Sequence, residues 1–317
     1  MISRKTLNNK LGRFFTVFIS ITLYTALLFS TATFAEQGKF YAKKEYSGQP
    51  IPTFIQNKHR LPKPIFDDKP EYIDFYYRAW QIGFEHFKKP QATSPFVSNF
   101  IDEAFNDNIF LWDMSFSTMW GNYAHHIFPS IDGLDNFYRT QMEDGEIVRE
   151  VGEKDGHLGV IGWSEPGTEG NLNHPILPWA ELESYKITNN KKRLANVYLP
   201  LVKYRESFSK IYHPATGLYL TDKAAMDDSP RNEQMLAGID VAAEMVIFDL
   251  WLAEIATELG KNNEAKQFIA RADDYAKFIN EKRGKKEGPN PVAEKRLSNN
   301  IVLTKLKIAL NSKLGYF

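Results

Sequence analysis

The feature that most constrains the fold is a helical spacing of apolar residues that begins at Glu71 and continues to about residue 281. Apolar residues recur there at steps of three and four, which places them on one face of each successive helix. The periodic runs are about 12 to 25 residues long and the loops between them are short, as in antiparallel helix pairs. The sequence therefore predicts an all-α fold.

Seven helices are expected from this spacing. Pro90 ends the first expected helix. The fourth begins at Pro178 and ends at two asparagines, Asn189 and Asn190. The expected helices lie at 71–89, after Asp113 as far as about 127, and at 134–138, 178–190, 194–211, 230–258 and 265–279.

Residues 1–35 have the composition of an export signal. A basic start precedes an uncharged apolar run at 14–29, and Thr33 and Ala35 are small residues before a plausible cleavage point near Glu36. The alternative is an uncleaved membrane anchor, but the run of about 16 residues is shorter than the roughly 20 that a spanning helix needs. We expect an exported, periplasmic or extracellular protein without a stable membrane anchor after cleavage.

The segments on either side of the helical region have a different character. Residues 36–70 are polar and rich in proline, so an extended lead-in is expected. Residues 282–317 hold nine Lys and Arg against two Glu, a sum of 9 − 2 = +7, although the whole chain has net charge +0. One interpretation of 282–317 is a natural basic tail.

Composition excludes several classes of site. Equal numbers of basic and acidic residues, 39 each, give no electrostatic reason to expect nucleic acid as a partner. The absence of cysteine excludes disulfides, thiolate metal sites and a cysteine nucleophile. No glycine-rich phosphate loop or HExxH motif is present, and adjacent His125 and His126 cannot share a helix face. We expect no metal and no cofactor.

The loops between the expected helices carry polar residues beside tryptophan. Trp112 and Asp113 precede the second helix, where Asp113 is either a helix cap or part of a sugar site. In a sugar site the tryptophan ring covers the apolar face of the sugar, and the carboxylate accepts from its hydroxyls. Gln141 belongs to a polar segment with an Asp-Gly turn signal, while His174 and Trp179 lie in and after a proline-rich loop.

The stretch 224–234, AAMDDSPRNEQ, places two aspartates before a serine and a proline. Pro230 fits the first turn of the expected 230–258 helix, and Asp228 or Ser229 fits its cap. This leaves Asp227 without a structural explanation. A general acid at this position needs a raised pKa, from burial or from a second carboxylate.

These segments, in this order, resemble the (α/α)6-barrel glycosidases of the trehalase and glycoside hydrolase family 63 group. The chain is most similar to bacterial members that act on small α-glucosides and α-mannosides, such as glucosylglycerate and mannosylglycerate hydrolases. The resemblance covers about residues 70–280. It is carried by Trp112-Asp113, Arg139-x-Gln141-x-x-Asp144-Gly145, His174-Pro175 with Pro178-Trp179, and Met226-Asp227-Asp228-Ser229-Pro230-Arg231.

The resemblance implies an inverting glycosidase in which Asp227 is the general acid. It implies that Trp112, Asp113 and Gln141 hold the sugar next to the scissile bond, with His174 and Trp179 lining the same cleft and Arg231 supporting the acid. Ala225 replaces a glycine of the family pattern.

The resemblance also implies a toroid that is incomplete here, with about seven of its twelve helices. The family's general-base glutamate lies beyond the matched region, and neither Glu287 nor Glu294 has a matching context. A truncation or frameshift near residue 282 is therefore the second interpretation of the basic tail. Two functions follow as hypotheses, an inverting hydrolase of a small α-linked glycoside and a catalytically inactive carbohydrate-binding fragment. A helical scaffold of repeat type is the third, although no fixed-period repeat is present.

Overall fold

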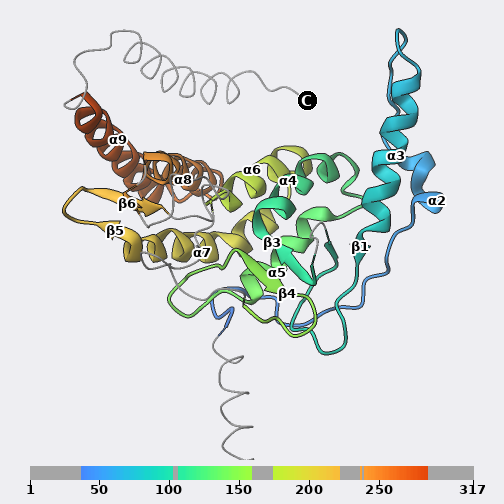
Figure 1. Ribbon diagram of the computed structural model, residues 1–317, viewed down its shortest axis with the longest axis horizontal. Coiled ribbons are helices and arrows are strands. Elements are labelled where there is room, and N and C mark those ends of the chain that lie inside the picture. Colours follow the sequence, from blue (N-terminus) through green and yellow to red (C-terminus); the bar gives the residue numbers. More distant parts are fainter. Residues whose placement is uncertain (1–36, 103–105, 159–173, 222–235, 238, 285–317) are drawn as a thin grey trace, which may run out of the picture. The chain divides into compact units, whose positions relative to one another are not determined.

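The computed structural model describes residues 37–102, 106–158, 174–221, 236–237 and 239–284. These residues are mostly helical, with short strands between the helices (Figure 1), so the predicted all-α class is confirmed at this coarse level. The chain divides into two compact units, residues 1–272 and 273–317. The boundary falls inside the last described helix, and the other described elements belong to the first unit.

The described elements have the following bounds. The α-helices are α2 (Phe54–Asn57), α3 (Glu71–Glu85), α4 (Leu111–Gly121), α5 (Asp135–Arg139), α6 (Leu177–Thr188), α7 (Lys191–Ser207), α8 (Ile239–Glu258) and α9 (Asn262–Gly284). Short 3-10 helices occupy Lys58–Arg60, Asn122–Ala124, Ser130–Leu134 and Phe208–Ile211. The strands are β1 (Phe87–Lys88), β2 (Phe100–Ile101), β3 (Asn108–Phe110), β4 (Glu150–Gly152), β5 (Tyr212–His213), β6 (Leu218–Thr221) and β7 (Leu236–Ala237). They pair antiparallel as β1–β2, β3–β4 and β5–β6–β7.

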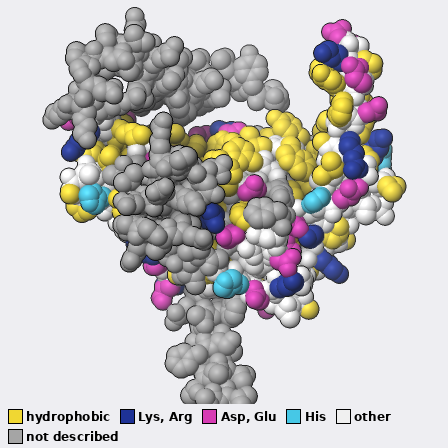
Figure 2. Space-filling model, in the orientation of Figure 1, with side chains coloured by type: hydrophobic (Ala, Val, Ile, Leu, Met, Phe, Trp, Pro, Cys, Tyr) yellow, Lys and Arg dark blue, Asp and Glu magenta, His cyan; other side chains and the backbone are white. Residues whose placement is uncertain are grey.

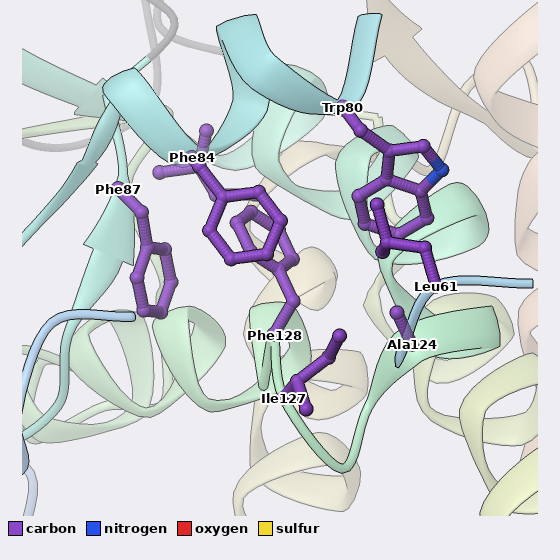
Figure 3. Packing of buried hydrophobic residues seen from close by; sticks show 8 residues of the cluster. Leu61, Trp80, Phe84, Phe87, Ala124, Ile127 and Phe128 are labelled. Carbon is purple, nitrogen blue, oxygen red and sulfur yellow. The ribbon is translucent and has the colours of Figure 1, made fainter. Parts of the chain in front are cut away.

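Helix α3 forms where the sequence predicts a helix, with acidic residues in its first turn that suit the positive end of the helix dipole. It ends at Glu85, before Pro90, because Phe87 and Lys88 pair with β2. Its buried face carries Trp80 and Phe84, whose ring centroids lie 5.7 and 4.9 Å from that of Phe128. Figure 3 shows this cluster, in which Leu61 also takes part.

The lead-in is attached to the helical body rather than simply extended. The backbone N–H of Gly38 donates to the carbonyl of Gln141 at 2.7 Å, and Tyr41 is buried against Tyr138 with ring centroids 5.3 Å apart. Gly38 has a φ of +65°, and a Cβ there would collide with the carbonyl oxygen of Arg139. The lead-in therefore contributes core residues and also contains α2.

Helices α6 and α7 form the pair that the sequence predicts best. Pro178 lies in the first turn of α6, and Asn189 ends it in the left-handed conformation with a φ of 52°. The side chain of Asn190 then caps α7 by accepting from the backbone N–H of Arg193 at 3.0 Å. The turn between the two helices is therefore determined by local residues.

The expected helix from Pro230 to residue 258 is wrong at its start. Leu236 and Ala237 form β7, whose register partners on β6 are Thr221 and Leu220, and α8 begins only at Ile239. The expected first-turn residue Pro230 and the expected caps Asp228 and Ser229 lie in the segment 222–235, outside the described residues.

Alternate helices along the chain pack side by side. Helix α6 contacts α4 and α8, and α7 contacts both α6 and α8 (Figure 1). The starts of α4 and α6 meet where the ring of Trp112 lies beside that of His174, and the ends of α6 and α8 meet where Tyr185 donates to Glu258 at 2.8 Å. Helices α4, α6 and α8 therefore run parallel as one layer, and their N-terminal ends share one edge.

Candidate functional site

The N-terminal ends of α4, α6 and α8 bring together aromatic and acidic side chains. The ring of His174, just before α6, lies 4.8 Å from the ring of Trp112 in the first turn of α4. Its Nδ1 atom lies 2.7 Å from Oε1 of Glu244, in the second turn of α8. We call the set Trp112, Asp113, Phe116, His174, Trp179 and Glu244 the aromatic site.

The aromatic rings of this site form a connected row. The ring centroid of Phe116 lies 5.0 Å from that of Trp112 and 5.3 Å from that of Trp179. Trp112 keeps 38% and Phe116 45% of its surface exposed. Figure 2 shows hydrophobic side chains gathered on the face over α4 and α6. Exposed aromatic faces beside carboxylates are suited to a ligand with both apolar faces and hydroxyl groups, such as a sugar.

Glu244 is a member of the site that the sequence analysis missed. Its Oε1 atom faces His174, while its Oε2 atom is buried and has no hydrogen-bond donor among the described residues. Asp240, one turn earlier on α8, accepts from the hydroxyl of Thr221 at 3.3 Å. Two carboxylates four residues apart, directly after the Asp227 segment, were the available signal, because such residues share a helix face.

The pair β3–β4 adds two further polar residues near the start of α4. The backbone N–H of Leu111 donates to the carbonyl of Arg149 at 2.9 Å, and Phe110 is the register partner of Glu150. The guanidinium of Arg149 donates to Glu150 at 3.1 Å, and Asn108 donates to the same carboxylate at 3.2 Å. These two residues are half-buried and paired with each other.

Asp113 is not a helix cap. Helix α4 begins at Leu111, three residues earlier than expected, and Phe110 occupies the cap position without a side-chain hydrogen bond. Asp113 therefore lies in the first turn and is exposed. A carboxylate at this position is favoured by the positive end of the helix dipole, and it is also open to a ligand.

Gln141 lies apart from the aromatic site. Its side chain is 0% exposed, and its amide donates to the carbonyls of Gly145 at 2.8 Å and Pro200 at 3.0 Å. In this structure Gln141 therefore has no exposed surface for the expected sugar contact. The amide instead ties the Asp144–Gly145 turn to α7.

Two of the predicted site residues, Asp227 and Arg231, lie outside the described residues. The ends of their segment are described. Thr221 and Leu236 are register partners, and Thr221 also bonds to Asp240 in the first turn of α8. The chain thus leaves and re-enters the described part at the N-terminal end of α8, the same helix end that carries Glu244.

The opposite end of α4 and α6 carries a buried charge network, which we call the Arg193 network (Lys43, Asp132, Asp135, Glu181 and Arg193). Arg193 donates to both carboxylate oxygens of Glu181 at 2.8 Å and to Asp135 at 2.8 Å. Burial alone would raise the pKa of Asp135, but the charges of Arg193 and Lys43 hold it below its usual value. The same carboxylates hold the pKa of Arg193 well above its usual value against the effect of burial.

A cavity lined by described residues lies apart from the aromatic site. It has a volume of about 550 Å³ and lies between α3 and the end of α4, with Tyr76, Trp80 and Trp120 among its mainly apolar walls. Among the described residues there is no group of three or more His, Asp or Glu side chains placed to hold a metal ion. The helices described here include none with the length and apolar character needed to cross a bilayer.

The comparisons with known proteins place the chain beside one long relative. No protein-family model matches the chain. An uncharacterized protein of Borreliella burgdorferi (strain ATCC 35210 / B31) is 29% identical over 179 residues, which cover 55% of this chain. The same alignment covers 36% of that protein, so the chain spans about a third of the relative's length. The relative's name assigns it no activity.

Proposed function

We propose that the chain binds a small α-linked glucoside or mannoside at the aromatic site and that this binding serves an inverting glycoside hydrolase. The observation that carries the proposal is the exposed row of Trp112 and Phe116, backed by His174 and flanked by carboxylates. Ring faces of this kind contact the C–H face of a pyranose, and carboxylates accept hydrogen bonds from its hydroxyls.

The proposed fold is part of an (α/α)6 toroid. Two findings support it: α4, α6 and α8 form one parallel layer, and α7 packs antiparallel between α6 and α8. In such an arrangement every inner helix begins at the same end of the ring, so loops that precede inner helices share one site. The glycosidase resemblance stays a proposal beside this arrangement, and so do trehalose, glucosylglycerate and mannosylglycerate as substrates.

Asp227 is the proposed general acid, with Arg231 as its support. The ends of its segment lie at the start of α8, which favours a position near the aromatic site. Inversion needs a second carboxylate roughly 6.5–9.5 Å from the acid, with a water molecule between them. Whether the chain supplies that base decides between hydrolysis and binding alone.

The second candidate function is carbohydrate binding without turnover. Ala225 favours it, because a methyl group replaces the family's glycine two residues before the acid and narrows the backbone conformations available there.

Calorimetry with trehalose, glucosylglycerate and mannosylglycerate tests binding, and release of the free sugar tests turnover. Trp112→Ala is expected to weaken binding at least tenfold, because it removes the exposed ring. Phe75→Ala is the matched control, since Phe75 is an exposed aromatic residue on α3. Equal loss in both variants, or no binding of any of the three sugars, would contradict the proposal.

Asp227→Asn separates the two functions. If the chain is a hydrolase, this variant loses turnover by several orders of magnitude while binding stays within a few-fold of the unmodified chain. Turnover at the unmodified rate would show that Asp227 is not the acid. Binding without turnover in the unmodified chain would establish the second function.

We also propose export, with residues 1–35 as a cleaved signal. This rests on the basic start and the apolar run at 14–29, which lie outside the described residues. N-terminal sequencing of the protein from its native cell is expected to find Glu36 at or near the first position. An intact Met1 would contradict cleavage.

A further inference from the structure

A second cavity lies at the C-terminal ends of α4 and α6, away from the aromatic site. Its volume is about 380 Å³, within the range of roughly 300–1,000 Å³ that is usual for small-molecule sites. Polar side chains dominate its walls, and they are His125, Asp132, Ser184, Thr188, Asn190 and Arg193. The cavity borders the Arg193 network, which supplies two of these residues.

Arg193 has no donor left for an anion. Its Nε and Nη2 atoms each donate one hydrogen bond to Glu181 at 2.8 Å, and Nη2 also donates to the carbonyl of Ile131 at 2.9 Å. Its Nη1 donates to Asp135 at 2.8 Å and to Asp132 at 3.4 Å. These contacts use all five N–H groups of the guanidinium. An anionic ligand therefore gains no hydrogen bond from the arginine that lines the cavity.

The groups that remain toward the cavity are mainly acceptors. The side chain of Asp132 is 39% exposed and its bond to Arg193, at 3.4 Å, is long. The Nδ1 atom of His125 lies 3.0 Å from the carbonyl of Asn122, so in the neutral ring Nδ1 carries the proton and Nε2 is an acceptor. The hydroxyl of Ser184 is buried in a residue only 2% exposed, and it has no hydrogen-bond partner among the described residues.

The charge of the network also favours a cation. Its carboxylates are Asp132, Asp135 and Glu181, and its cations are Lys43 and Arg193, a sum of 2 − 3 = −1. An uncompensated negative charge beside a partly enclosed cavity is costly unless a cation or a proton neutralises it. Asp132 is the carboxylate of the network that lines the cavity.

We propose that this cavity binds a small organic molecule with a primary ammonium group, of the size of an amino sugar. The ammonium donates three hydrogen bonds, and the carboxylate of Asp132, the hydroxyl of Ser184 and Nε2 of His125 are the acceptors available to it. The remaining volume accommodates a hydroxylated ring beside the amide of Asn190. The proposal is independent of glycoside binding at the aromatic site.

Calorimetry with glucosamine and glucose tests the proposal on the unmodified chain. The two sugars share one ring and differ by an ammonium in place of a hydroxyl, and at about pH 7 the amine is mostly protonated. Glucosamine is expected to bind at least tenfold more tightly than glucose or N-acetylglucosamine. Equal binding of glucosamine and glucose, or no heat with glucosamine because the cavity holds only water, would overturn the proposal.

Variants place the binding in this cavity. Asp132→Asn is expected to remove the preference for glucosamine, and Ser184→Ala to weaken glucosamine binding several-fold. Asp107→Asn removes one exposed negative charge elsewhere, where Asp107 pairs with Lys154, and is expected to leave the preference unchanged. Trp112→Ala is also expected to leave it unchanged, and loss in that variant would assign glucosamine to the aromatic site and overturn the proposal.

Discussion

The two ends of the α4–α6 pair use their side chains in opposite ways. At the C-terminal end, Arg193 directs all its donors to carboxylates and a carbonyl of the chain itself. At the N-terminal end, Trp112 and Phe116 keep more than a third of their surface exposed. Buried charge is tolerated only when it is paired, whereas a half-exposed aromatic row gains from being covered. The first arrangement stabilises the fold, and the second is open to a ligand.

The largest expected effect comes from breaking the Arg193 network. Arg193→Met leaves Glu181 and Asp135 buried without their cation, and the free energy of unfolding should fall by about 3–5 kcal/mol. Urea unfolding followed by circular dichroism measures this loss. Arg78→Met is the control, because the exposed pair of Arg78 with Glu85, at 3.8 Å, is worth about 0–1 kcal/mol. Similar losses of unfolding free energy in both variants would show that the Arg193 network stabilises the fold no more than an exposed ion pair does.

Gln141 tests the same contrast between side chains that stabilise the fold and side chains that are open to a ligand. The family resemblance assigns this residue to the sugar site. Gln141→Leu leaves the carbonyls of Gly145 and Pro200 without their donor, at a cost of about 1–3 kcal/mol for each. Sugar affinity at the aromatic site should not change. Gln267→Leu, at an exposed position of α9, is the matched control and should keep its stability. A selective loss of sugar affinity in Gln141→Leu at unchanged stability would restore the sequence-based assignment.

The pH dependence of stability distinguishes two aspartates. Burial and the charge of Asp135 raise the pKa of Asp132 above its usual value of 3.8. The folded state therefore favours the protonated form of Asp132, which stabilises the fold at low pH. This stabilisation is lost as the pH rises above about 4 through the raised pKa. Relative to Asp132→Asn, the unmodified chain should lose stability from about pH 3.5 to 7, as measured by urea unfolding at each pH.

Asp107 should behave in the opposite sense. Its hydrogen bond with Lys154 lowers its pKa, so its contribution is lost as the pH falls. The comparison of the unmodified chain with Asp107→Asn is the control, and the same sign in both comparisons would refute the placement of Asp132 beside Asp135.

The sequence predicted those parts of the molecule that neighbouring residues determine. Pro178 and Asn189 bound α6 as expected, because a proline in the first turn and a left-handed asparagine act within one turn of helix. Strand β7 was missed because its two residues become a strand only when the edge of β6 is available, and their register partners lie 15 and 17 residues earlier in the chain. No local pattern carries that information.

The candidate site shows the same limit. Trp112, His174 and Trp179 were predicted, since a tryptophan beside polar loop residues is visible along the chain, and the structure brings them together. Glu244 was missed because its partner His174 lies 70 residues away. Gln141 was assigned to the site through the family resemblance, and its burial could not be foreseen because it depends on Pro200, which lies 59 residues later. Contacts between distant helices decide which polar residues face a ligand.

The smallest expected effect comes from Asp113, the residue whose role the sequence leaves open. Asp113→Asn removes a charge from the first turn of α4, which should cost about 0.3–1 kcal/mol of unfolding free energy through the helix dipole. Asp74→Asn is the matched control, because Asp74 is an exposed aspartate in the first turn of α3. The two variants should lose similar stability in urea. Only Asp113→Asn should also weaken glycoside binding, by several-fold, because only Asp113 is exposed on the same helix turn as Trp112; equal affinity in both variants would reduce Asp113 to a helix-stabilising charge.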